Sequence, residues 1–115
     1  MKRCPWYAEV IQRAAQPRSP FSAWVGTSLL FAGSNAWAMA RPHRERGARA
    51  VTVLPPGELP ASIEWPPVAD WIVDAGDLPA GEAVEVGRCL IDCGARRVQM
   101  VGDQLASSLR LLRVE

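Results

Sequence analysis

The sequence predicts an α/β domain: a small sandwich with a mostly parallel sheet of four or five strands and about three helices. Four short apolar runs carry this prediction, and each ends at, or is followed by, Gly, Pro or Asp. The runs are residues 28–32, 50–54, 70–74 and 97–101. Such runs are typical of strands buried on both faces, which mostly occur in parallel sheets. Helix-like segments fill two of the three gaps and give a strand–helix–strand rhythm.

The first predicted element is a helix over residues 5–16. Trp6, Val10 and Ala14 fall on one apolar stripe, with charged and amide residues opposite. A proline stands at each end of the segment, which suits the start and the stop of a helix. We expect this helix to pack on the sheet.

Two more helices are predicted between the runs. The helix over 34–41 can be capped by Ser34 or Asn35, because a short polar side chain accepts from a free backbone N–H. We expect Pro42 to end or bend it, since proline lacks that N–H. The helix over 80–93 has an apolar stripe and is followed by a glycine.

The remaining segments are less regular. The connection from residue 54 to residue 67 is rich in proline and has no helix pattern, which favours an antiparallel or edge position for one strand. Residues 104–115 fit either a helix or a last edge strand. We favour the strand, after a turn at 106–108.

Length and composition indicate one domain covering residues 1–115. Of these residues 49% are hydrophobic, which is enough for a core. We expect a cytoplasmic protein without a membrane segment, because the start has no secretory signal and no apolar run approaches the ~20 residues of a span. Three cysteines and one histidine do not form a metal-ligand set. No metal, cofactor or catalytic nucleophile–base pair is expected.

The charge is unevenly distributed along the chain. Residues 1–50 hold eight basic and two acidic residues, or +6, whereas residues 51–115 hold five basic and ten acidic residues, or −5. A dense basic segment around His43 suggests a partner-binding patch. Its candidate residues are Arg41, Arg44, Arg46 and Arg49. Nucleic acid is an alternative partner for this segment, and arginines at a helix end also suit the helix dipole.

Among five tryptophans, Trp65 is the candidate for partner contact. It lies between Glu64 and two prolines, where we expect it to be partly exposed, and tryptophan is common at interface hot spots. Trp37 and Trp71 are expected in the core.

An alternative interpretation is a Rossmann-like domain that binds a small ligand, a nucleotide or phosphate. Ser34 and Asn35 follow a strand and open a helix, where backbone N–H groups favour an anion. Asp74 and Asp103, with Asp77, follow strands and could share one sheet edge, where carboxylates hold Mg²⁺ or transfer protons. Helix capping and turn formation explain the same residues without a ligand. The phosphate-binding glycine motifs are missing.

The stretches Val53-Leu-Pro-Pro-Gly-Glu58 and Ile63-Glu-Trp-Pro-Pro67 resemble small proteins of bacteriophages and integrative mobile elements. The resemblance covers about fifteen residues and implies an accessory protein that binds a host component, of which anti-CRISPR inhibitors are one kind. We therefore predict a small non-enzymatic binding protein that contacts a host protein, for example to inhibit a defence complex. The alternatives are the ligand-binding domain, a nucleic-acid-binding accessory protein and, for assembly, a homodimer.

Overall fold

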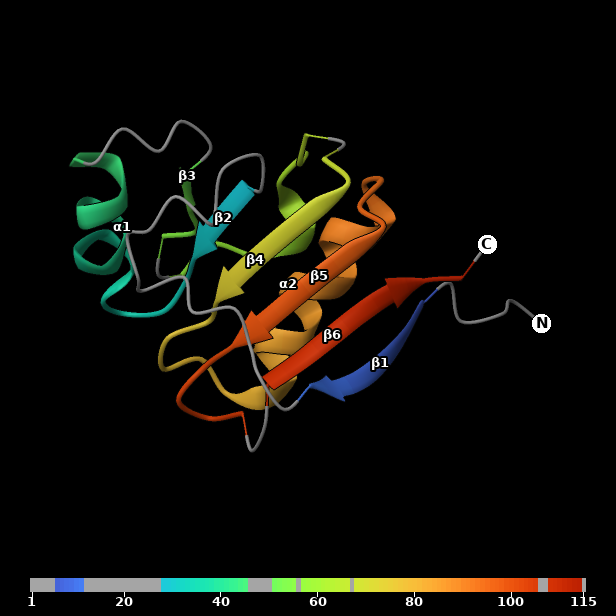
Figure 1. The fold of residues 1–115 in the computed structure, drawn as a ribbon. Coiled ribbons are helices and arrows are strands. Elements are labelled where there is room, and N and C mark those ends of the chain that lie inside the picture. The colour runs from blue at the N-terminus through green and yellow to red at the C-terminus, as the bar shows by residue number, and fades with distance from the viewer. Residues whose placement is uncertain are drawn as a thin grey trace.

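The computed structural model describes residues 6–11, 28–45, 51–55, 57–66, 68–105 and 108–114, and these form one mixed sheet with helices on both faces (Figure 1). The strands are β1 (Trp6–Ile11), β2 (Ser28–Phe31), β3 (Val51–Val53), β4 (Asp70–Asp74), β5 (Arg97–Val101) and β6 (Ser108–Arg113). The helices are α1 (Ala36–Glu45), α2 (Ala80–Asp92) and the short 3-10 helix η2 (Pro60–Ser62).

The sheet order is β1-β6-β5-β4-β2-β3, and the four apolar runs supply its parallel part. β3, β2, β4 and β5 are parallel neighbours, with Leu30 opposite Thr52 on one side and Val73 on the other. β6 and β1 follow as antiparallel strands. The predicted α/β class and its parallel centre are confirmed. β3 takes an edge position, and residues 108–113 form the strand that we favoured, although β1 covers the outer side of β6.

The predicted helix over 5–16 is wrong, because residues 6–11 form β1. This strand pairs with β6 in antiparallel register, and Arg110 Nη1 donates to Glu9 Oε1 at 3.1 Å across the pair. Its aromatic and β-branched residues suit a strand as well as a helical stripe. The free edge of β6 supplies backbone partners that local periodicity does not reveal. The described residues therefore contain six strands and two α-helices, instead of four or five strands and three helices.

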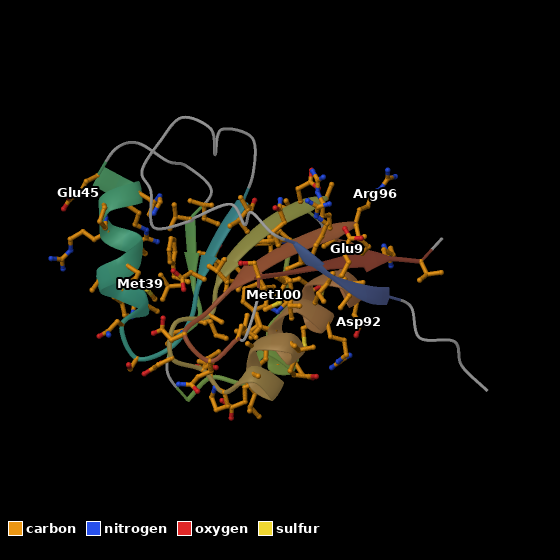
Figure 2. All side chains as sticks on the ribbon, turned by 60° about the horizontal axis from the view of Figure 1, so that its bottom comes forward. Glu9, Met39, Glu45, Asp92, Arg96 and Met100 are labelled. Atoms are coloured by element: carbon orange, nitrogen blue, oxygen red, sulfur yellow. The ribbon has the colours of Figure 1, made fainter. Side chains whose placement is uncertain are left out.

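Each α-helix covers a different face of the sheet (Figure 2). α2 packs on the face that carries Val73, Val98 and Leu111. α1 packs on the opposite face, against Leu29 and Phe31 of β2 and their neighbours. Successive strand residues point to opposite faces, so β4 contributes to both layers of core. None of the helices in the described part of the chain is long and apolar enough to cross a membrane.

The α1 helix continues to Glu45, past Pro42, which we expected to end or bend it; Pro42 does not end it. Its buried residues are Ala36, Ala40 and His43, which recur at helical spacing. The two small alanines and the ring of His43 form one narrow buried stripe. Trp37 lies outside this stripe. Its side chain is 55% exposed, so the expectation that Trp37 belongs to the core is wrong.

Trp65 differs from its prediction in the opposite direction, because it is buried. Its residue surface is only 5% exposed, its Nε1 donates to the carbonyl oxygen of Pro60 at 3.1 Å, and its ring meets that of Trp71 edge-on, with centroids 6.2 Å apart. The Pro-rich connection folds η2 against α2 and brings this indole into the core. The expectation of a partly exposed Trp65 available to a partner is therefore wrong, and Trp65 closes one end of the α2-side core.

Candidate functional site

The order of the parallel strands reverses at β2, since the chain places β3 on one side of β2 and then returns to place β4 on the other. Open α/β sheets bind ligands outside the carboxyl ends of strands at such a point. The loops after β2 and β4 meet here, as the bond from Ala32 N to Asp74 O (2.9 Å) shows. We call this region the switch edge: residues 33–35 together with residues 75–78.

A carboxylate of the chain itself occupies the predicted anion site at the start of α1. Ser34 N donates to Asp77 Oδ1 at 2.9 Å, and Ser34 Oγ donates to Asp77 Oδ2. These hydrogen bonds hold the pKa of Asp77 below its ordinary value, with the side-chain bond as the main cause. Asn35 is exposed beside them. Because Asp77 takes up both donors of Ser34, these two groups are not available to a ligand anion.

Glycine is required where the two loops touch. A Cβ on Gly76 would lie 2.5 Å from the carbonyl oxygen of Ala32, and its φ of +58° is a conformation that residues with side chains rarely adopt. A Cβ on Gly33 would lie 2.6 Å from Asp77 Oδ1. The close approach that allows the Ser34–Asp77 contact therefore depends on the missing side chains.

The other two predicted carboxylates also lie near Gly76, in turn-forming positions. Asp74 is fully buried, and its Oδ1 accepts from Gly76 N at 3.0 Å. Asp103 is exposed, and its backbone N donates to Gly76 O at 2.8 Å. The sheet edge thus brings all three aspartates into one region, as the sequence predicted. Within the described ranges, no group of three His, Cys, Asp or Glu residues is arranged to hold a metal ion.

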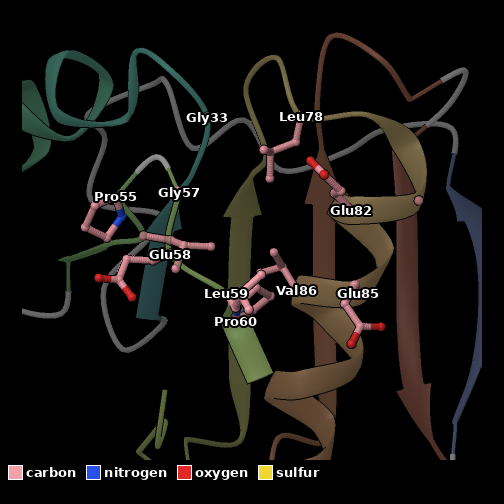
Figure 3. Close-up of a pocket in the computed structure, with 12 residues that line it drawn as sticks. Gly33, Pro55, Gly57, Glu58, Leu59, Pro60, Leu78, Glu82, Glu85 and Val86 are labelled. Carbon is pink, nitrogen blue, oxygen red and sulfur yellow. The ribbon is translucent and has the colours of Figure 1, made fainter. Parts of the chain in front are cut away.

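A cavity of about 460 Å³ opens beside the switch edge, on the side of the sheet that α2 covers (Figure 3). Its walls are the first turns of α2, the segment from Leu54 to Pro60 and Leu78. The lining residues are Gly33, Leu54, Pro55, Gly57, Glu58, Leu59, Pro60, Leu78, Gly81, Glu82, Glu85 and Val86. Most of them are apolar or glycine, and the three charged ones are glutamates. Three segments that are distant in the sequence form this cavity, so no local pattern predicts it.

The glutamates of the cavity differ in their partners. Glu85 binds Arg88 through two hydrogen bonds, one of them from Nε to Oε2 at 2.9 Å, and these lower the pKa of Glu85. The carboxylates of Glu58 and Glu82 form no ion pair with any residue that the structure describes. The cavity therefore carries negative charge that the described residues around it do not fully neutralise.

The outer surface of α1 carries part of the predicted basic patch. Arg41 and Arg44 are exposed, and Trp37 precedes them at i, i+4 and i+7 spacing on one helical stripe. The Arg44 guanidinium carbon lies 5.7 Å from the centre of the Trp37 ring, which is a cation–π arrangement. We call Trp37, Arg41 and Arg44 the α1 ridge. Arg46 and Arg49 lie outside the described residues.

His43 is not part of this basic surface, although it lies between the arginines in the sequence. It is 2% exposed and packs on Phe31 with ring centroids 5.2 Å apart. Burial lowers the pKa of His43, and the nearby charge of Asp74 opposes this shift. The imidazole is therefore a neutral core group near pH 7.

No protein-family model, curated protein or solved structure matches this chain. Its function is therefore inferred from the geometry of the α1 ridge, the switch edge and the cavity.

Proposed function

We propose that this chain is a small non-enzymatic binding protein that contacts another protein through the α1 ridge. The observation that supports the proposal is the exposed Trp37 ring next to two exposed arginines on one helical stripe. Tryptophan and arginine are the residues most enriched at interface hot spots, where they lose their water on binding. An indole that is 55% exposed has a large apolar surface left for a partner to cover.

The chemistry of the ridge indicates the partner's surface. Two guanidinium groups favour an acidic surface, and the indole favours an apolar recess within it. Arginines near the end of a helix also stabilise the helix dipole, which accounts for Arg44 but not for an exposed tryptophan. The proposal keeps Arg41 and Arg44 of the four arginines expected from the sequence and replaces Trp65 by Trp37. It stays a prediction that the partner is a protein of the cell that hosts a phage or mobile element.

The test is affinity capture from a lysate of the cells that encode the chain, followed by quantitative mass spectrometry. The baits are the native chain, Trp37→Ala, the double variant Arg41→Glu/Arg44→Glu, and, as a control, Arg113→Glu at the exposed last residue of β6. Nuclease treatment of half of each lysate separates protein contacts from nucleic-acid contacts. Thermal melts verify that each bait is folded, since exposed substitutions usually change stability by less than ~0.5 kcal/mol.

We expect a protein that the native chain and Arg113→Glu capture equally and that both ridge variants lose. A hot-spot tryptophan contributes about 2 kcal/mol or more, which corresponds to roughly a thirtyfold loss of affinity. The proposal fails if the ridge variants retain every captured protein. Recovery that disappears after nuclease treatment would instead indicate nucleic acid, because arginine and an exposed aromatic ring also suit a single strand.

A further inference from the structure

We propose that the cavity beside the switch edge binds a small organic cation: a molecule with an apolar body and one protonated amine. Its volume of about 460 Å³ is within the range of small-molecule sites, roughly 300–1,000 Å³. It also lies near the carboxyl ends of parallel strands, where α/β sheets hold ligands. The apolar body and the protonated amine of the proposed ligand each match a separate feature of the cavity walls.

The apolar body of the ligand is inferred from the leucines and prolines that line the cavity. Leu54 lines the cavity and is 4% exposed, whereas Leu59 is 70% exposed and is one of the large apolar side chains left open to solvent in the described chain. Leu59, Pro60 and Val86 of α2 line the same cavity (Figure 3). A ring placed between these walls would cover Leu59 on its inner side and remove apolar surface from water.

The protonated amine of the ligand is inferred from the charges of the residues that line the cavity. The described lining residues include three glutamates and no basic residue. Arg88 compensates Glu85 in part, which leaves Glu58 and Glu82 as the carboxylates available to a cation. Figure 3 shows Glu82 extending from the first turn of α2 toward Leu78, across the upper part of the cavity. An ammonium group near Glu82 would form a charge-assisted hydrogen bond.

The same charges argue against an anionic ligand. α2 begins at Ala80 without a side-chain cap, so its free N–H groups could attract phosphate. Glu82 lies in that first turn and brings a negative charge to the same place. Asp77 already occupies both donors of Ser34, just before α1. A nucleotide would therefore meet carboxylates at both helix starts.

The test uses tryptamine as the probe and indole-3-propionate as its acidic counterpart, each titrated into the native chain and followed by amide chemical shifts. We expect saturable shifts centred on Leu78, Gly81 and Val86 with tryptamine, and binding at least about tenfold weaker with the acid. Glu82→Gln should weaken tryptamine about threefold or more, as expected for one partly exposed charge contact. Glu64→Gln removes the same charge from an exposed position outside the lining and should leave the affinity unchanged.

A second variant tests the contact between the apolar wall of the cavity and the apolar body of the ligand. Leu59→Ser should weaken both probes by a similar factor, because it removes a wall and leaves the charges in place. The proposal is overturned if tryptamine produces no saturable shifts at the lining residues, if the acid binds as well as the amine, or if Glu82→Gln and Glu64→Gln have equal effects. These outcomes do not bear on the α1 ridge, because α1 and the cavity lie on different sides of the sheet.

Discussion

Replacing Trp65 by alanine should destabilise the fold strongly, whereas the same change at Trp37 should hardly affect it. Trp65 is 5% exposed, donates to Pro60 O at 3.1 Å and packs edge-on against Trp71 at 6.2 Å. Truncation of a buried tryptophan costs about 3–5 kcal/mol. The lost hydrogen bond contributes about 1 kcal/mol of this and the aromatic pair about 0.5–1.5 kcal/mol. Trp37 is 55% exposed, and its truncation should stay within ~0.5 kcal/mol.

The assay is urea unfolding followed by far-UV circular dichroism, which does not depend on the fluorescence of the replaced indoles. A domain of this size has about 5–15 kcal/mol of stability, so Trp65→Ala can leave little folded protein. Trp65→Phe then keeps the test quantitative: it retains a ring, loses the bond to Pro60 and should cost about 1–2 kcal/mol. A cost below about 1 kcal/mol for Trp65→Ala, or equal costs at Trp65 and Trp37, would refute the packing described for the Pro-rich connection.

Two further predictions concern the switch edge and α1. Gly76→Ala should destabilise by about 2 kcal/mol or more, because the added Cβ would lie 2.5 Å from Ala32 O at a φ of +58°. Gly57→Ala, with a φ of +88° but nothing within 4 Å of its Cβ, should cost less, and equal urea midpoints would contradict the close approach. Burial holds the pKa of His43 below its ordinary 6.5, so below about pH 6.5 the unfolded chain binds this proton more readily and stability falls. Urea midpoints at pH 7.5 and pH 5 should therefore differ more for the native chain than for His43→Gln, and identical differences would contradict a buried neutral imidazole.

The parallel centre of the sheet was predictable because each of its strands is a short run rich in apolar residues that ends at, or is followed by, Gly, Pro or Asp. β1 was not, since its apolar residues satisfy both a helical and an extended period. Pairing with β6, about a hundred residues away, decides between the two. Local sequence patterns do not contain that information.

The predictions for Trp37 and Trp65 were both wrong for a similar reason: Trp37 is exposed and Trp65 is buried. Hydrophobicity alone puts Trp37 inside, but the α1 face that meets the sheet carries alanines, which allow close packing on β2 and β3. The spacing of Ala36, Ala40 and His43 was the available signal. Burial of Trp65 depends on how the Pro-rich connection folds over α2, and no periodicity marks that path.

The candidate site was predictable in position and not in detail. Ser34 and the aspartates do meet at one sheet edge, because parallel strands bring their carboxyl ends together. The contact from Ser34 to Asp77 spans 43 residues, so the sequence did not show that the anion site is filled by the chain itself. The cavity likewise requires Gly33, Leu54 and Val86 from three separate segments.

Site-specific photo-cross-linking tests the proposed binding role of α1 most directly, and it does not require the partner to be known. A photoreactive p-benzoylphenylalanine would replace Ala38, which is exposed and adjacent to Trp37, or, as the control, Arg113, the exposed last residue of β6. Irradiation in the cells that encode the chain should give a discrete protein adduct from position 38 and none from position 113. The adduct should disappear when Arg41→Glu and Arg44→Glu are added. An adduct from position 113 alone, or one from position 38 that survives both charge reversals, would contradict a partner held by the α1 ridge.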